Sequence, residues 1–358
     1  MDIRVDPLPQ GSRAAAPSDP AKLGFGKYFA SRMLSISWSE GTGWHDAHIG
    51  PYQPLVLEPS AAVFHYGQEI FEGLKAYRWA DGGVRLFRPE MNAARLNRSA
   101  RRLCLPELPQ EVFLDGIAQL VRLEREAVPA AEGTSLYIRP TLIAVDRYLG
   151  VKPATECLFY VILSPVGAYY AAGFNPVRIL VEDQFVRAVP GGTGEAKTGG
   201  NYAASLAAGR KAKEQGFEQV LWLDAIHRRF VEEVGAMNIF FVAGKDRLVT
   251  PKLTGSFLPG VTRDSVLALA PTLGCAVEEG TVAIDELLAD VRAGRVTEVF
   301  GTGTAAVVSP VGVLGYKGEE VVVGGGGVGP VTRRLYDTLT GIQCGRQPDP
   351  FGWVRRVA

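Results

Sequence analysis

Apolar and polar positions along the chain alternate between helix-like and strand-like spacing. Helical spacing predicts helices at 88–104, 113–125, 201–215, 263–273, 284–293 and 330–341, and a further short helix around 67–74. Runs of β-branched and aromatic residues predict strands at 136–143, 157–163, 177–181, 219–224, 238–242 and 298–300, and short strands within 52–87. Because helices and strands mix without strict alternation, the pattern favours an α+β fold over a doubly wound sheet.

Breaker residues divide the chain into two parts. Proline, glycine and asparagine are frequent over 165–176, which indicates a passage between domains. At 358 residues the chain is also longer than one ordinary core requires. We expect a small N-terminal domain over 1–168 with a flexible arm at 1–25, a connection containing the first strand of the next domain over 169–190, and a large domain over 191–358.

Composition favours a globular enzyme and disfavours several other classes of protein. Lys plus Arg equals Asp plus Glu at 38 each, so no net charge attracts nucleic acid or an anionic membrane. We find no apolar run long enough to span a bilayer and no signal-peptide pattern. The four cysteines lack CxxC spacing and predict reduced thiols in the cytoplasm. The four histidines form no metal-binding pattern, so we expect no metal.

One lysine stands in an unusually glycine-rich segment. Lys197 lies within GGTGEAKTGGNY, which covers 191–202. Glycines let the backbone adopt positive φ and let a bulky ligand approach closely. A desolvated lysine can lose its proton and form a Schiff base with a carbonyl compound. The segment therefore indicates either a cofactor bonded to the lysine or a phosphate-binding loop.

The phosphate-binding loop fits the sequence poorly. The P-loop pattern is GxxxxGK[ST], and residues 191–198 read GGTGEAKT, with Ala196 where the pattern requires glycine. That glycine allows the backbone to wrap around the phosphates. A P-loop nucleotide-binding protein therefore remains only a distant alternative.

Pyridoxal 5'-phosphate (PLP) fits the sequence better. This cofactor needs a lysine amine, a carboxylate near its pyridine nitrogen and a cradle for its phosphate. Glu233 lies in the largely apolar stretch FVEEVGAM at 230–237, where a charge is costly unless it has a partner. Glycines, hydroxyls and backbone N–H groups that suit a phosphate occur at 260–262 and 303–305, and the first of these leads into a predicted helix. Together these features predict a PLP site.

Several strings of residues, taken in order, resemble the branched-chain amino acid aminotransferases, which are PLP enzymes of fold type IV. The strings are HYG at 65–67, IFEGLKAY at 70–77, NAARL at 92–96, YIRP at 137–140, SPVGAY at 164–169, EAKTGGNY at 195–202, QVLWLD at 219–224, EVGAMNIF at 233–240, LPGVTRD at 258–264 and FGTGTAA at 300–306. The resemblance runs from about residue 25 to residue 353. It implies a two-domain fold, with a small N-terminal α/β domain and a larger pseudo-barrel domain.

The resemblance implies a role toward the cofactor for each matching residue. Lys197 would form the Schiff base with PLP and then carry the substrate proton. Glu233 would pair with the pyridine nitrogen and keep it protonated, while Tyr202 would bond the phenolate oxygen. The residues implied for the phosphate are Arg95, Thr262, Thr304 and the backbone of Val261.

The resemblance also implies where a substrate binds. The residues implied for the α-carboxylate are Tyr137, Thr304 and Ala305. Those implied for the second carboxylate of glutamate are Arg139, Tyr66 and Tyr169. An arginine at the rim of an apolar pocket can serve both substrates, because it binds a carboxylate bidentately and stays hydrated when an apolar side chain enters.

The apolar pocket itself is implied to combine two copies of the chain. Phe71 and Tyr202 would form its wall. In the family a loop of the partner subunit completes the pocket, and here that loop contains Leu149 and Val151, so the resemblance implies a homodimer.

The implied reaction is the transamination of L-leucine, L-isoleucine and L-valine with 2-oxoglutarate, which gives branched-chain 2-oxo acids and L-glutamate. Within fold type IV the alternatives are a D-amino acid aminotransferase and an aminodeoxychorismate lyase. The YIR string at 137–139 and the EVGAMN string at 233–238 resemble the branched-chain enzymes instead.

Overall fold

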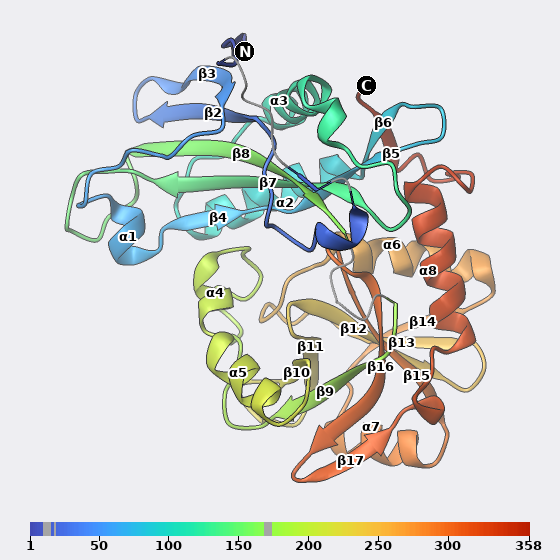
Figure 1. Ribbon diagram of the computed structural model, residues 1–358. Helices are drawn as coiled ribbons and strands as arrows, with labels where there is room; N and C mark the ends of the chain where they lie inside the picture. The colour runs from blue at the N-terminus through green and yellow to red at the C-terminus, as the bar shows by residue number, and fades with distance from the viewer. Residues whose placement is uncertain (10–15, 18, 168–173) are drawn as a thin grey trace. The chain divides into compact units, whose positions relative to one another are not determined.

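A computed structural model describes residues 1–9, 16–17, 19–167 and 174–358 (Figure 1). It divides into two compact units: unit 1 comprises Met1–Ala171, Ala196–Gly199 and Gly341–Ala358, and unit 2 comprises Ala172–Glu195 and Gly200–Thr340. Each unit combines a sheet with helices, which confirms the expected α+β class. The expected domains at 1–168 and 191–358 stay a prediction. Within the described ranges, no helix combines the length and the apolar character needed to cross a membrane.

Unit 1 is built on one sheet. Its strands are β1 (Arg4–Val5), β2 (Arg32–Ser39), β3 (Gly43–Pro51), β4 (Glu69–Phe71), β5 (Leu74–Arg78), β6 (Val84–Phe87), β7 (Ser135–Ala144), β8 (Glu156–Val166) and β18 (Val354–Arg356). They run in the order β1-β3-β2-β8-β7-β5-β6-β18, and β4 pairs with β7. The last strand therefore returns to the sheet of unit 1, and β1 anchors part of the expected arm to β3.

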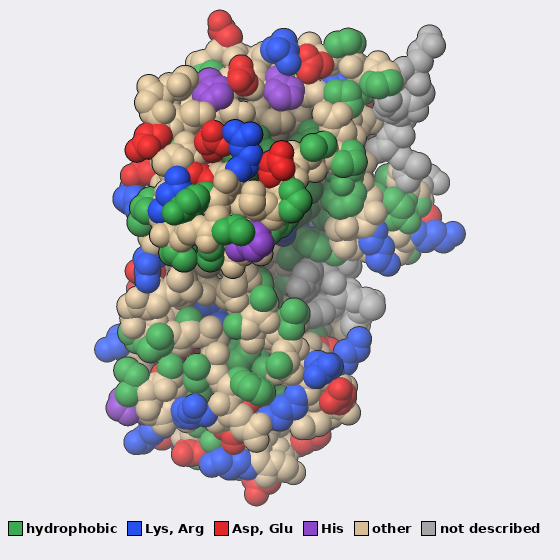
Figure 2. Space-filling view, turned by 90° about the vertical axis from the view of Figure 1, so that its left-hand side faces the viewer, with side chains coloured by type: hydrophobic (Ala, Val, Ile, Leu, Met, Phe, Trp, Pro, Cys, Tyr) green, Lys and Arg blue, Asp and Glu red, His purple; other side chains and the backbone are tan. Residues whose placement is uncertain are grey.

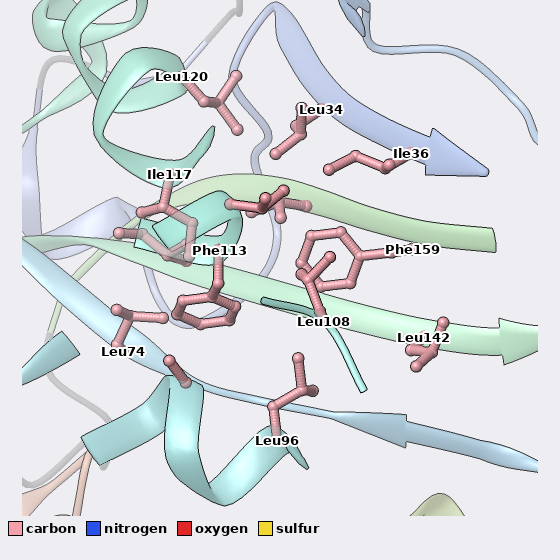
Figure 3. Close-up of a cluster of buried hydrophobic side chains, with 14 of the residues drawn as sticks. Leu34, Ile36, Leu74, Leu96, Leu108, Phe113, Ile117, Leu120, Leu142 and Phe159 are labelled. Atoms are coloured by element: carbon pink, nitrogen blue, oxygen red, sulfur yellow. The ribbon is translucent and has the colours of Figure 1, made fainter. Parts of the chain in front are cut away.

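The core of unit 1 lies between this sheet and the helices α2 (Pro89–Arg102) and α3 (Gln110–Leu123). Figure 3 shows Leu96 of α2 and Phe113 of α3 among side chains that come from the strands, including Leu142 and Phe159. Burying each such side chain stabilises the fold by about 1.5–3 kcal/mol. Because side chains alternate along a strand, the residues next to Leu142 in β7 face the opposite side of the sheet.

Residues 32–74 differ from the sequence-based expectation. The short helix predicted around 67–74 is wrong, because α1 (Ala62–Tyr66) ends at Gly67 in the left-handed conformation, with φ of 57°. Residues 69–71 instead pair with β7 as β4, and their hydrogen bonds to that strand replace helical ones. Strands β2 and β3 were not predicted, although Leu34 and Ile36 alternate with serines in β2.

Unit 2 contains a sheet that closes on itself. Its strands are β9 (Val177–Glu182), β10 (Gln219–Leu223), β11 (Val231–Val234), β12 (Met237–Ala243), β13 (Arg247–Pro251), β14 (Ala276–Gly280), β15 (Val296–Gly303), β16 (Val307–Tyr316) and β17 (Glu319–Val322). They run in the order β11-β10-β9-β16-β15-β12-β13-β14, with β17 on β16. Because β11 pairs with β12 as well as with β10, the path forms a ring, which confirms the expected pseudo-barrel.

The remaining helices largely follow the predicted pattern. They are α4 (Gly199–Ala203), α5 (Leu206–Glu214), α6 (Val261–Leu269), α7 (Ile284–Arg292) and α8 (Pro330–Gln343). The single helix predicted at 201–215 is divided between α4 and α5. At the break, the Ser205 hydroxyl donates a 2.6 Å hydrogen bond to the carbonyl of Tyr202, which competes with the helical backbone bond to that oxygen.

Charged side chains of both signs are interspersed on the face drawn in Figure 2. This agrees with the equal numbers of basic and acidic residues, 38 each. No broad field of one sign marks this face as a surface for a polyanion.

Lys75 of β5 is an ionisable group inside unit 1. Burial lowers the pKa of Lys75 from 10.5 to about 8, against a smaller opposing effect of Cys344. The folded protein therefore binds fewer protons than the unfolded chain between about pH 8 and 10.5. Stability rises with pH through that window, and the full penalty of the buried charge applies below it.

Replacing Lys75 by methionine is expected to raise the free energy of unfolding at pH 7 by up to about 3 kcal/mol, because the apolar side chain has no charge to desolvate. The gain should shrink between pH 8 and 10.5. Urea unfolding at pH 7 and pH 10 measures both effects, with Lys213→Met on the exposed surface of α5 as the control. Equal pH slopes for the wild type and Lys75→Met would contradict the assignment of a lowered pKa.

Candidate functional site

Lys197 is held on both sides by backbone hydrogen bonds within unit 1. Its N–H donates to the Ser99 hydroxyl of α2 at 2.9 Å. Its carbonyl accepts the N–H of Phe71 of β4, also at 2.9 Å. The Nζ atom lies 4.6 Å from the centre of the Phe71 ring. The glycine-rich segment around the lysine is therefore fixed to α2 and β4 at this residue, so the amine has a defined position over an aromatic ring.

Arg95 forms a buried pair with Glu72. The Nε and Nη2 atoms of Arg95 donate to the two carboxylate oxygens of Glu72 at 2.7 and 2.9 Å. The side-chain amide of Asn92 donates to the same carboxylate at 2.7 Å. Burial opposes the charge of Glu72, but Arg95, its hydrogen bonds and the charge of Lys197 together hold the pKa of Glu72 below its ordinary value. The bidentate contact with Glu72 thus orients Arg95, the residue predicted to bind the phosphate, and the charge of Lys197 acts on the same carboxylate.

Arg139 lies on the sheet face opposite the core of unit 1. Its Nη2 donates to the Tyr137 hydroxyl at 3.0 Å. Its guanidinium carbon is 4.7 Å from the centre of the Phe71 ring and 5.2 Å from that of Tyr137. Its buried Nε atom has no hydrogen-bond partner in the described part of the chain. This arginine combines aromatic neighbours with an unused donor, an arrangement that can bind a carboxylate beside apolar surface.

The loop after β7 presents two exposed apolar residues. Leu149 is 64% exposed and Val151 is 85% exposed. The base of the loop is fixed, because the carboxylate of Asp146 accepts hydrogen bonds from the N–H and the hydroxyl of Thr155. The hydroxyl of Tyr66 donates to the carbonyl of Leu149, so the predicted substrate residue Tyr66 contacts this loop. Tyr169 lies outside the described residues.

Glu233 of β11 lies in unit 2 with a cation beside it. The Nε of Arg187 is 2.9 Å from Glu233 Oε2, and the two side chains are only 5% and 3% exposed. The side-chain amide of Asn238 donates to Glu233 Oε1 at 3.3 Å. Glu233 is buried, and the cation beside its charge on the protein side is Arg187.

Sequence reasoning missed Arg187. Its Nη1 also donates to the carbonyl of Ser256 at 3.2 Å and to that of Gly194 at 3.4 Å. A side chain at Gly194 would collide with Ser256, so glycine is required for this close approach. One guanidinium thus joins Glu233, the segment at 256 and the glycine-rich segment. The only hint in the sequence is that a buried glutamate needs a cation somewhere.

The predicted phosphate segment at 260–262 begins helix α6. The helix has Gly260 as its N-cap, a residue with no side chain to cap the first turn. Val261 and Thr262 follow it and are buried. A helix start without a side-chain cap leaves backbone N–H groups for an anion, and the helix dipole favours negative charge there. A side chain at Gly260 would collide with Asn238, so this start also requires glycine.

The second predicted segment connects β15 and β16. Thr304 and Ala305 lie in the turn between these strands and are half-buried. A Cβ at Gly303 would lie 3.1 Å from Met237 of β12, so the backbone here runs close to that strand. Tyr202, in α4, is likewise half-buried.

Each unit contains residues that match particular chemical groups of PLP. Unit 1 supplies a lysine amine placed over the Phe71 ring, and unit 2 supplies a buried carboxylate beside an arginine and a helix start with glycine as its N-cap. A pyridinium N–H, a phosphate and a carbonyl carbon are the complementary groups on the cofactor.

Comparisons with known proteins agree with this chemistry. The model of the family "Amino-transferase class IV" matches residues 69–313. The chain is 55% identical over 340 residues to branched-chain-amino-acid transaminase 1 of Bacillus subtilis (strain 168), and the match covers 95% of each protein. It is 52% identical over 357 residues to the branched-chain-amino-acid aminotransferase of Mycobacterium tuberculosis (strain H37Rv), covering 99% of this chain and 96% of the relative.

Solved structures give the same result. The branched-chain amino acid aminotransferase of Escherichia coli superposes with a TM-score of 0.74 at 28% identity, covering 91% of this chain and 100% of that one. The branched-chain amino acid aminotransferase of T.th., complexed with N-(5'-phosphopyridoxyl)-L-glutamate, superposes with a TM-score of 0.73 at 29% identity, covering 91% and 99%. The chain therefore belongs to the class IV aminotransferases and, within that family, to the branched-chain amino acid aminotransferases.

Proposed function

We propose that this protein is a PLP-dependent transaminase that moves the amino group of L-leucine, L-isoleucine or L-valine to 2-oxoglutarate. The observation that carries the proposal is Arg139, whose guanidinium lies against the Phe71 ring and keeps a buried donor unused. On this sheet face the apolar Phe71 ring suits the side chain of leucine, and the Arg139 donor without a hydrogen-bond partner in the described structure suits the side-chain carboxylate of glutamate. We expect the reaction to take place in the cytoplasm.

Bound PLP supplies an electron sink for the bonding electrons at the substrate Cα. Lys197 would hold the cofactor and carry the proton that leaves Cα, since its backbone is fixed to α2 and its amine lies over the Phe71 ring. Glu233 would accept a hydrogen bond from the pyridine N–H, and Arg187 and Asn238 keep its carboxylate oriented for this. The residues proposed for the other polar groups of the cofactor are Tyr202, Arg95, Val261, Thr262 and Thr304.

The substrate would be oriented by its carboxylates. The residues proposed for the α-carboxylate are Tyr137, Thr304 and Ala305, and those proposed for the second carboxylate of glutamate are Arg139, Tyr66 and Tyr169. Phe71 and Tyr202 would exclude water around an apolar side chain. The hydrogen bond from Arg139 to the Tyr137 hydroxyl supports these roles, because it orients both polar side chains on one face of β7.

We propose that the protein acts as a homodimer. Leu149 and Val151 would complete the apolar pocket of the partner subunit. Two exposed apolar side chains on a loop with a fixed base support this proposal, since such residues are costly to leave in water and can be covered by another chain.

Replacing Arg139 by alanine is expected to raise the KM for glutamate and for 2-oxoglutarate by about 10- to 100-fold, because a charge-assisted bidentate contact is lost. The KM for leucine should change much less, since an apolar side chain makes no such contact. Initial rates with each substrate measure the difference, with Arg101→Ala on the surface of α2 as the control. Equal losses for leucine and glutamate would show that Arg139 serves the fold or the α-carboxylate instead.

The direct test of the reaction is glutamate formation from L-leucine and 2-oxoglutarate by the PLP-loaded protein. We expect turnover with L-leucine and none with D-leucine or D-alanine. Turnover confined to the D-amino acids would assign the D-amino acid aminotransferase reaction. Release of pyruvate from aminodeoxychorismate without transamination would assign the lyase reaction.

A further inference from the structure

Glu69 shares a sheet face with Arg139. In the pairing of β4 with β7, Glu69 is opposite Ile143 and Phe71 is opposite Thr141, while Ile70 and Leu142 between them enter the core. Because side chains alternate along a strand, Glu69, Phe71, Thr141 and Arg139 all project from the face opposite that core. The Phe71 ring, two residues from Glu69, lies against the Arg139 guanidinium.

The charges of this face act on one another. Burial raises the pKa of Glu69, and the hydrogen bond from Gly199 and the positive charge of Arg139 act in the opposite direction. Tyr160 is paired with Thr141 across β7 and β8, and both charges act on its hydroxyl. Burial raises the pKa of this hydroxyl most, the charge of Glu69 raises it further, and the charge of Arg139 lowers it. Glu69 is therefore an acidic group close enough to Arg139 for the two charges to interact.

Glu69 also contacts the segment that carries the lysine. The backbone N–H of Gly199, two residues after Lys197, donates a hydrogen bond to Glu69 Oε1. A Cβ at position 199 would lie against this carboxylate, so the Glu69 side chain would have to move to admit any larger residue there. The geometry thus places one carboxylate on the face that holds Arg139, in contact with the backbone next to the lysine.

We propose that Glu69 is a specificity-determining residue that balances the affinity of the site for dicarboxylate and apolar substrates. The inference rests on the proposed function, in which both kinds of side chain enter one pocket. A negative charge near Arg139 offsets part of its attraction for the second carboxylate of glutamate, and it lowers the cost of leaving Arg139 without an anion when leucine is bound. Without Glu69, the dicarboxylate would hold the site too tightly for efficient exchange.

The test removes the charge of Glu69 and keeps its hydrogen-bond acceptor. Glu69→Gln is expected to raise the ratio of the KM for leucine to the KM for glutamate about tenfold, which corresponds to about 1.4 kcal/mol. Calorimetry on the PLP-loaded protein gives a second reading without turnover. Glutarate should bind the variant more tightly than the wild type, and 4-methylvaleric acid should not. The control is Glu111→Gln on α3, a helix that covers the opposite face of the sheet.

Two results would overturn the proposal. The first is an unchanged affinity for glutarate in Glu69→Gln, or a weaker one. The second is a shift seen in Glu69→Ala but not in Glu69→Gln, which would assign the effect to the lost contact with Gly199 and not to charge. Failure of the wild type to transaminate leucine would instead refute the proposed function. The two failures can be told apart, because the calorimetric comparison does not depend on turnover.

Discussion

Replacement of Lys197 by alanine is expected to lower the rate of leucine transamination by about a thousandfold or more. The variant loses both the amine that holds the cofactor and the base that carries the Cα proton, and a positioned proton carrier alone contributes about 10²–10⁴-fold. Lys197→Arg should be equally inactive, because a guanidinium keeps the charge near Glu72 but cannot form the covalent link. Initial rates at saturating leucine and 2-oxoglutarate measure the loss.

A peptide map identifies the lysine directly. Borohydride reduction of the PLP-loaded wild type should fix the cofactor's mass on the peptide that contains Lys197. The other lysine that could form the link to the cofactor is Lys75, because burial lowers the pKa of Lys75 to about 8 and makes its amine easier to deprotonate. Lys213→Ala, on the exposed surface of α5, is the control for the loss of a lysine as such. Label on Lys75, or wild-type rates in Lys197→Ala, would refute the assignment.

Replacement of Arg187 by methionine is expected to lower the free energy of unfolding by about 3–5 kcal/mol, because the carboxylate of Glu233 is left buried without its cation. The carbonyls of Gly194 and Ser256 lose a charged donor at the same time. The affinity for PLP should fall as well, since Glu233 is no longer oriented. Chemical denaturation of the protein without cofactor and titration with PLP measure the two effects separately.

The matched control is Arg292→Met. Arg292 pairs with Glu319 at 2.6 Å, but both side chains are more than half exposed, so the same substitution should change stability little. Arg187→Lys should recover part of the loss, because the charge remains while the forked geometry does not. If Arg187→Met unfolds like the control and binds PLP normally, the pair with Glu233 has neither the structural nor the positioning role assigned to it.

The site could be predicted from the sequence where its chemistry follows short strings. Lys197 and Glu233 each stand in a local context that is unusual for a charged residue, and this context can be read without a fold. Arg187 and Glu69 could not be found in this way. Each owes its importance to a contact with a residue far along the chain, Glu233 or Gly199, and nothing in its own neighbours marks it.

The fold could be predicted where the local signal and the tertiary environment agree. Helices α2 and α3 carry their apolar residues at helical spacing and bury that face, so they were predicted close to their observed bounds. The segment at 67–74 was predicted wrongly, because pairing of β4 with β7 outweighs its local preference. The closure of the unit 2 sheet through β11 and β12 depends on pairings that no single segment encodes.

The measurement that tests the central claim most directly is the visible absorption spectrum of the PLP-loaded protein during substrate addition. We expect a visible cofactor band that disappears with L-leucine and returns with 2-oxoglutarate, which would demonstrate both halves of the transamination on one sample. A band that ignores L-leucine but responds to a D-amino acid would contradict the proposed substrate. A protein that stays colourless after PLP is supplied would contradict the PLP site itself.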